Sequence, residues 1–197
     1  ALLMLVNFVV MIVIGIWIIV GWHRFILVEE TPLSYWPIWR GGLIKRYFAR
    51  AFFIGLAMLV PLIVVSIGAV MLLGARNMVM GPNGDAPAMW MLYSLIIGAS
   101  VSYFSLRISF GLPAASVEKL MFIRESWEDT KSYQAEIIGA SIVLTLVYIP
   151  VNIINFKFVN SLPLILIGQV LGALIMLLSI SVLTTLYGVI KEARELS

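Results

Sequence analysis

The sequence contains no cysteine, a single histidine and few charged side chains. Of its 197 residues, 12% are charged and 62% are hydrophobic. The lack of cysteine excludes disulfides, thiolate metal sites and a cysteine nucleophile, and the lone His23 excludes a histidine pair. Soluble domains carry about 25% charged and about 45–50% apolar residues. The composition therefore excludes a soluble globular protein, a disordered tail and a nucleic-acid module.

Long uncharged runs occupy most of the chain, and the mean hydropathy is +1.07. A helix that spans a membrane needs about 20 mostly apolar residues. We therefore expect an all-α, polytopic transmembrane helix bundle that forms one transmembrane domain over residues 1–197. Pro163 is expected in the first turn of the last helix, a position that proline favours. The five expected spans are residues 1–22, 51–75, 86–106, 137–156 and 163–190.

The basic residues predict the orientation, because lysine and arginine gather on the cytoplasmic side of membrane proteins. Only Arg76 and Lys157 fall on one side of the expected spans, and all the other basic residues fall on the opposite side. We expect the latter side, with the C-terminus, to be cytoplasmic. Ala1 is then external, and no charged segment of a signal peptide precedes the first run. This start predicts a further helix upstream.

The two long cytoplasmic connectors, residues 23–50 and 114–136, are predicted to lie along the membrane surface as amphipathic segments. In the first, aromatic residues alternate with basic ones, as is typical of the headgroup level, and Gly41-Gly42 is expected to interrupt the helical pattern. The second is expected to form an amphipathic helix, with Arg124 and Glu128 paired across one turn. Its apolar face is predicted to carry Leu120, Ile123 and Trp127.

Two residues stand out because charged or ionisable groups are costly at membrane depth. His23 is expected to be an interfacial side chain bonded to Glu29, Glu30 or lipid, and the alternative is a single axial ligand to a chlorin. Arg107 is expected to anchor a span at the inner boundary or to pair with Glu118 or Glu136. The alternative for Arg107 is contact with a substrate or a lipid headgroup.

Small and bulky side chains suggest packing sites. Small residues four apart let helices approach closely, which predicts helix contacts at Gly98, with Ser94 and Ser102, and at Gly168 and Gly172. Arg24 and Trp127 are expected to anchor and pack their segments, and Trp127 is also a candidate docking residue. Basic residues near the headgroups attract anionic lipid by about 1 kcal/mol each. The predicted lipid-facing basic residues are Lys45, Arg46 and Arg50.

Motifs of enzymes are missing from the sequence. It has no nucleophile elbow, no phosphate-binding glycine loop with lysine, and no zinc-binding helix with two histidines. Asp85 and Asp129 both lie outside the expected spans, which excludes an intramembrane aspartate pair. We therefore expect a protein that is not an enzyme and has no cofactor and no metal site.

Three stretches resemble a known group of proteins. Trp22-His23-Arg24-Phe25, which leads to Glu29-Glu30, resembles the Trp-His-Arg-Phe motif of uncharacterised alphaproteobacterial inner-membrane proteins. Residues 107–114 and 125–130 resemble the Arg-x-Ser-x-x-Leu-Pro and Ser-Trp-x-x-Thr patterns of those proteins and of the wider YciC-like group. The resemblance implies about six helices in a bacterial inner membrane and implies no activity.

Three functions remain open from the sequence. The preferred hypothesis is an accessory, scaffolding or assembly subunit of a larger bacterial membrane complex, respiratory or photosynthetic. The second is a small transporter or permease-like protein, which Arg107 and the matching prolines Pro61 and Pro150 favour. The third is a lipid-binding, membrane-shaping protein. The expected partners are membrane lipids, including anionic ones, and other membrane subunits, with no nucleic acid.

Overall fold

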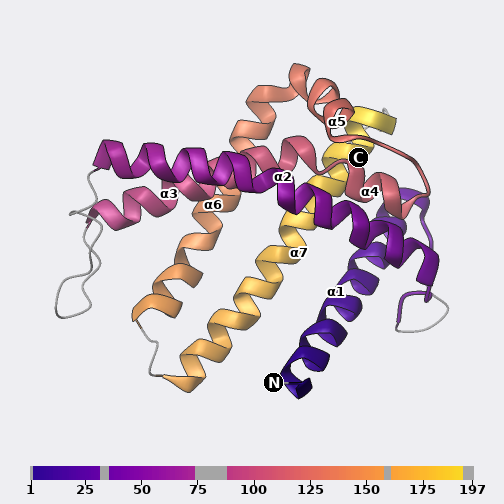
Figure 1. Ribbon diagram of the computed structural model, residues 1–197, viewed down its shortest axis with the longest axis horizontal. Coiled ribbons are helices and arrows are strands. Elements are labelled where there is room, and N and C mark those ends of the chain that lie inside the picture. The colour runs from indigo at the N-terminus through magenta and orange to yellow at the C-terminus, as the bar shows by residue number, and fades with distance from the viewer. Residues whose placement is uncertain (1, 32–35, 74–87, 158–160, 193–197) are drawn as a thin grey trace. The chain divides into compact units, whose positions relative to one another are not determined.

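The computed structural model describes residues 2–31, 36–73, 88–157 and 161–192 (Figure 1), and in these ranges the regular structure is entirely helical. The segment of residues 81–87, whose turn-forming residues predict an external connector between the second and third expected spans, lies outside these ranges, as do Pro32, Arg76 and Arg194. The elements are α1 (Leu2–Val28), α2 (Gly41–Leu73), α3 (Ala88–Ile108), α4 (Gly111–Ser116), α5 (Ile123–Asp129), the 3₁₀ turn η2 (Lys131–Tyr133), α6 (Gln134–Lys157) and α7 (Leu162–Glu192).

Four helices in the described ranges are long and apolar enough to cross a membrane: α1, α2, α6 and α7. Helix α3 is a further apolar helix, 21 residues long. The all-helical fold is thus confirmed in the described residues, the four long apolar helices fit a multi-pass membrane protein, and a fifth span at α3 stays a prediction. Pro163 lies in the first turn of α7, where the amide of Ile165 donates to the carbonyl of Ser161 (2.9 Å).

The first connector differs from the prediction for residues 23–50. Helix α1 continues to Val28, and α2 begins at Gly41, so most of this segment belongs to the two long helices. Gly41-Gly42 starts a helix and does not interrupt one. Tertiary packing explains the difference, because Leu43 and Tyr47 in the first turns of α2 are buried against Val20 of α1.

The second connector is not the single amphipathic helix predicted for residues 114–136. It consists of α4, an extended stretch, α5 and η2. Glu118 ends α4 in the left-handed conformation (φ 65°), and the amide of Lys119 donates to the carbonyl of Ala114 (2.9 Å). This is the hydrogen-bond pattern of a Schellman motif. Leu120 therefore lies outside any helix and is 81% exposed, so it cannot share a helical face with Trp127.

The chain divides into two compact units. Unit 1 comprises residues 1–55, 108–132 and 180–197, and unit 2 comprises residues 56–107 and 133–179. The charged residues are divided very unevenly between them. Those of unit 2 are Arg76, Asp85, Arg107, Glu136 and Lys157, and all the others belong to unit 1.

The core of unit 1 joins the end of α1 to the beginning of α2. Val20, Leu43 and Tyr47 form a buried cluster, and α4 packs against α1. The ring of Phe110 meets that of Tyr187 edge to face, with centroids 5.7 Å apart. Helix α7 is thereby joined to the segment that precedes α4.

Unit 2 contains a close approach between α3 and α6. A Cβ atom on Gly98 would lie 2.9 Å from Cγ2 of Thr145, which is less than a carbon–carbon contact allows. The lack of a side chain at Gly98 is therefore what lets the two helices come this near. On α7, Gly168 is buried, and a Cβ atom on Gly172 would make an ordinary contact with Val151 of α6.

Candidate lipid-binding surface of unit 1

A buried polar cluster holds three helices of unit 1 together. His23 of α1 is fully buried, with Nδ1 2.7 Å from the Thr184 hydroxyl of α7 and Nε2 3.2 Å from the Tyr47 hydroxyl of α2. The neighbouring residue, Trp22, donates from its indole to the hydroxyl of Ser181 (3.1 Å), which lies one turn before Thr184 on α7. The expected bonds from His23 to Glu29 or Glu30 are thus replaced by bonds to α2 and α7. Both ring nitrogens are engaged, so an axial ligand role would require breaking one of these bonds.

Glu30 is surrounded by two arginines at the end of α1. Arg24 donates from Nε to Glu30 (2.7 Å) and from Nη1 to the carbonyl of Ser116 (3.0 Å), and Arg40 lies 3.2 Å from the same carboxylate. Burial tends to raise the pKa of Glu30, but the bonds and charges of Arg24 and Arg40 outweigh it and hold the pKa below its ordinary value. Arg24 thus joins α1 to the C-terminal end of α4.

Trp36, Pro37 and Trp39, which follow α1 in the sequence, contact Trp17 and Gly21 on that helix. The indole of Trp17 donates to the carbonyl of Pro37 (3.1 Å), and its ring stacks on Trp36 (6.1 Å) and meets Trp39 edge-on (5.5 Å). Pro37 lies so close to α1 that a Cβ atom on Gly21 would fall 2.4 Å from its ring. Trp36 and Trp39 remain largely exposed, as side chains at a membrane boundary are.

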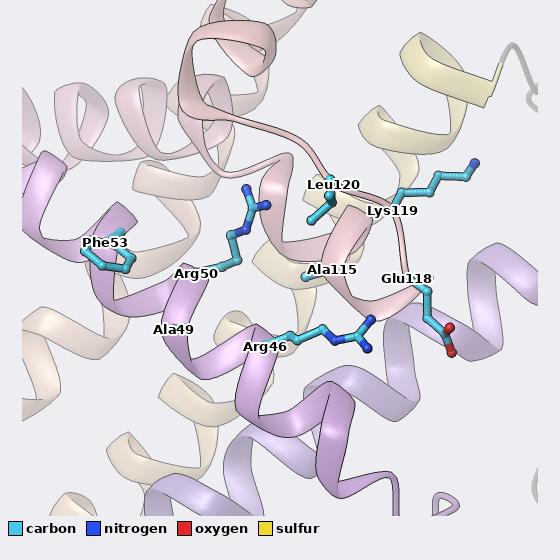
Figure 2. Close-up of a pocket in the computed structure, with 8 residues that line it drawn as sticks. All are labelled: Arg46, Ala49, Arg50, Phe53, Ala115, Glu118, Lys119 and Leu120. Carbon is cyan, nitrogen blue, oxygen red and sulfur yellow. The ribbon is translucent and has the colours of Figure 1, made fainter.

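A hollow of about 210 Å³ lies between α2 and the end of α4. Figure 2 shows Arg46 extending from α2 toward the turn that carries Ala115 and Glu118, while Arg50 extends in another direction, away from Glu118, and the side chain of Lys119 points away from both arginines. Lys119 instead pairs with Glu192 of α7 (2.8 Å). The hollow is lined by Arg46, Ala49, Arg50, Phe53, Ala115, Glu118, Lys119 and Leu120.

A larger hollow of about 510 Å³ shares Arg50 and Phe53 with the first. The guanidinium of Arg50 donates to the carbonyl of Met121 and lies over the ring of Phe122, 5.5 Å from its centre. Apart from the two arginines, Arg50 and Arg124, the wall is apolar or glycine. The remaining lining residues are Ile54, Ile108, Gly111, Met121, Phe122 and Ile123.

The structure separates the three predicted lipid-facing basic residues. Lys45 and Arg46 are exposed on α2, but Lys45 lines neither hollow. Arg46 lines the smaller hollow, and Arg50 lines both while it also supports residues 121 and 122. The sequence missed Phe53, Leu120 and Phe122 as part of this surface. The spacing of Arg46, Arg50 and Phe53 on one helix face was the available indication for Phe53.

Trp127 lies on α5, which is fixed by polar residues. The amide of Phe122 donates to Glu125 (2.9 Å) at the start of the helix, and buried Ser126 accepts a bond from the amide of Phe110 (3.3 Å). Trp127 itself is only half-buried. Two ion pairs involve α5 residues or the turn after it: Lys131 with Glu128 (2.5 Å) and Lys191 with Asp129 (2.7 Å).

Arg107, the last residue of unit 2 on α3, is 2% exposed. Its Nη1 donates to the Tyr103 hydroxyl one turn earlier (2.9 Å), and its guanidinium lies 5.7 Å from the centre of that ring. Tyr103 was not among the partners expected from the sequence. The expected partners Glu118 and Glu136 are both exposed. The buried position of Arg107 agrees with a packing role in α3.

In the part of the chain that the structure describes, no group of three histidine, aspartate or glutamate side chains is placed to hold a metal ion. The polar groups of unit 1 join helices to one another, and its two hollows combine arginines with apolar walls. Comparison of the chain with protein-family models, with curated proteins and with solved structures gives no match, so the resemblance to the YciC-like group rests on its three motifs alone.

Proposed function

We propose that this chain is a non-catalytic, multi-pass protein of a bacterial inner membrane that binds anionic lipid through unit 1 on the cytoplasmic side. The observation that carries the proposal is the pair of hollows in which Arg46, Arg50 and Arg124 stand beside exposed apolar side chains. Guanidinium groups bind phosphate with two parallel bonds. Apolar walls beside them suit the acyl region of the same lipid.

The orientation and the location belong to the same proposal. The excess of basic residues in the connectors of unit 1 supports a cytoplasmic position for those connectors and for the C-terminus. The resemblance to the YciC-like group supports the inner membrane. The negative cytoplasmic leaflet attracts basic side chains by about 1 kcal/mol each, so an arginine-lined surface at that leaflet would bind anionic lipid preferentially.

Lipid selectivity in nanodiscs tests the proposal. Brominated phosphatidylglycerol should quench the tryptophan fluorescence of the full chain more strongly than brominated phosphatidylcholine, and added salt should reduce the difference. Replacing Lys45, Arg46 and Arg50 together with glutamine should remove most of the difference. Equal quenching by the two lipids in the unmodified protein would refute the proposal.

An accessory subunit of a larger membrane complex is the second candidate function. Glycine costs roughly 0.5–1 kcal/mol relative to alanine inside a helix, yet Gly55 and Gly68 on α2 and Gly139 on α6 face open space, with no described atom within 4 Å of an added Cβ. Such positions suit close contact with a helix of another subunit. Extraction from native membranes in mild detergent tests this function, because a stoichiometric complex should survive, and Gly68→Leu should release the chain from it.

A further inference from the structure

We infer that the two hollows of unit 1 together hold one anionic phospholipid as a stoichiometric ligand, with its phosphate between Arg46 and Arg50 and an acyl chain against Phe53, Leu120 and Phe122. The inference rests on the proposed lipid binding and makes it more specific. General attraction to a charged leaflet needs only net positive charge, whereas a bound lipid needs a site with defined walls. The two possibilities make different predictions for individual residues.

The cationic part of the site is built on one face of α2. Arg46 and Arg50 are four residues apart, so their side chains leave neighbouring turns of the helix on the same side. Arg50 donates one hydrogen bond to the carbonyl of Met121. Because a guanidinium has five N–H donors, others remain for a phosphate. Glu118 lines the same hollow and partly offsets their charge. Lys119 contributes less because it pairs with Glu192.

The apolar part of the site is unusual for a connector. Leu120 and Phe122 lie in the non-helical stretch before α5, and these large apolar side chains are 81% and 64% exposed. Phe53, also largely exposed, follows Arg50 by one turn of α2 and lines both hollows. Burial of apolar surface is worth roughly 25 cal/mol per Å². A hydrocarbon chain laid over these three side chains would therefore be stabilised where a free phosphate ion would not.

The dimensions of the hollows agree with a lipid fragment. The larger one, at about 510 Å³, falls within the range of roughly 300–1,000 Å³ that small-molecule sites occupy. The smaller one, at about 210 Å³, lies beside Arg46 and suits a headgroup. Because Arg50 and Phe53 line both, the charged and the apolar parts of one amphiphile can occupy the two hollows together.

Native mass spectrometry of the full chain with added phosphatidylglycerol tests the site. We expect one tightly retained lipid per chain, and a loss of roughly fivefold in affinity in Arg46→Gln, which corresponds to about 1 kcal/mol. Lys45→Gln is the matched control, since it removes the same charge from the neighbouring position without touching either hollow. Its affinity should stay within twofold of the unmodified protein.

A variant that is expected to bind lipid more tightly serves as a control for folding, because a misfolded chain would not gain affinity. Glu118→Gln removes the acid from the smaller hollow and should tighten phosphatidylglycerol binding by roughly fivefold. Phosphatidylcholine with the same chains should not be retained, and millimolar inorganic phosphate should not displace the bound lipid. Displacement by phosphate would overturn the lipid assignment in favour of a plain anion site.

The remaining outcomes separate the two levels of the proposal. If Lys45→Gln and Arg46→Gln weaken binding equally, and several lipids bind without a defined stoichiometry, the specific site is overturned while general lipid binding stands. If no variant and no lipid charge changes retention, both the site and the proposed function fail. The specific site is supported if Glu118→Gln increases the affinity for phosphatidylglycerol and Lys45→Gln leaves that affinity unchanged.

Discussion

At the scale of single residues, the polar side chains of unit 1 mostly connect helices. Hydroxyl groups show how this is done in apolar surroundings: Thr184 donates to the carbonyl of Ile180 (2.6 Å) while it also bonds His23. A buried polar group that loses its partner costs about 1–3 kcal/mol. The packing of α1, α2 and α7 in unit 1 therefore depends on a few side chains whose individual removal is expensive.

Glu30 gives a prediction about pH. Its folded pKa lies below its ordinary value of 4.5, so its ion pairs stabilise the fold above that pH and cease to do so as the pH falls through the folded pKa. The melting temperature of Glu30→Gln should be lower than that of the unmodified protein at pH 7. The difference should shrink toward zero as the pH falls through the folded pKa of Glu30, which lies below 4.5. A difference that is constant with pH would contradict this origin, and Glu29→Gln is the exposed control.

Gly98 gives a prediction about packing. Gly98→Ala should lower the free energy of unfolding by about 1–3 kcal/mol, since the new methyl group overlaps Thr145. Adding Thr145→Ser removes the obstructing Cγ2 atom and should restore most of the loss. Gly139→Ala on α6, which faces open space, should instead be neutral or stabilising by up to about 1 kcal/mol. Unfolding in mixed micelles of increasing dodecyl sulfate content measures all three.

At the scale of elements, the long helices could be predicted and the connectors could not. The apolar runs located α1, α2, α6 and α7 because each run must be helical to satisfy its backbone in lipid. Their ends were missed by up to ten residues, since α2 begins at Gly41 and not at residue 51. The first turns of α2 are held by burial of Leu43 and Tyr47 against α1, a contact that one sequence cannot reveal.

The prediction of one continuous helix over residues 114–136 was wrong because of a backbone conformation. A helical-wheel analysis assumes continuous helix, but Glu118 adopts a left-handed conformation that usually favours glycine. Nothing in the local sequence indicates that choice. The two hollows depend on it, because the extended stretch after Glu118 carries Leu120 and Phe122. Of the candidate site, only Arg46 and Arg50 were thus foreseen, from their positive charge near the expected headgroup level, whereas Arg124 was predicted to pair with Glu128.

At the scale of the whole molecule, the segregation of charge predicts the topology. Since the chain has no cysteine, single introduced cysteines report their side of the membrane without background. In intact cells, a membrane-impermeant maleimide should label Asn83→Cys in the expected external loop and should leave Lys131→Cys unlabelled until the cells are lysed. Labelling of Lys131→Cys from outside would reverse the orientation and remove the cytoplasmic leaflet from the proposed function.

The bonds between α1 and α7 have a consequence for how the protein is made. Trp22 and His23 find Ser181 and Thr184 across separations of 159 and 161 residues. During synthesis from the N-terminus, Trp22 must therefore wait for Ser181 and His23 for Thr184 until α7 is made, while Tyr47 of α2 is available to His23 much earlier. We expect products truncated before α7 to lack both bonds and therefore to be less stable than the full chain.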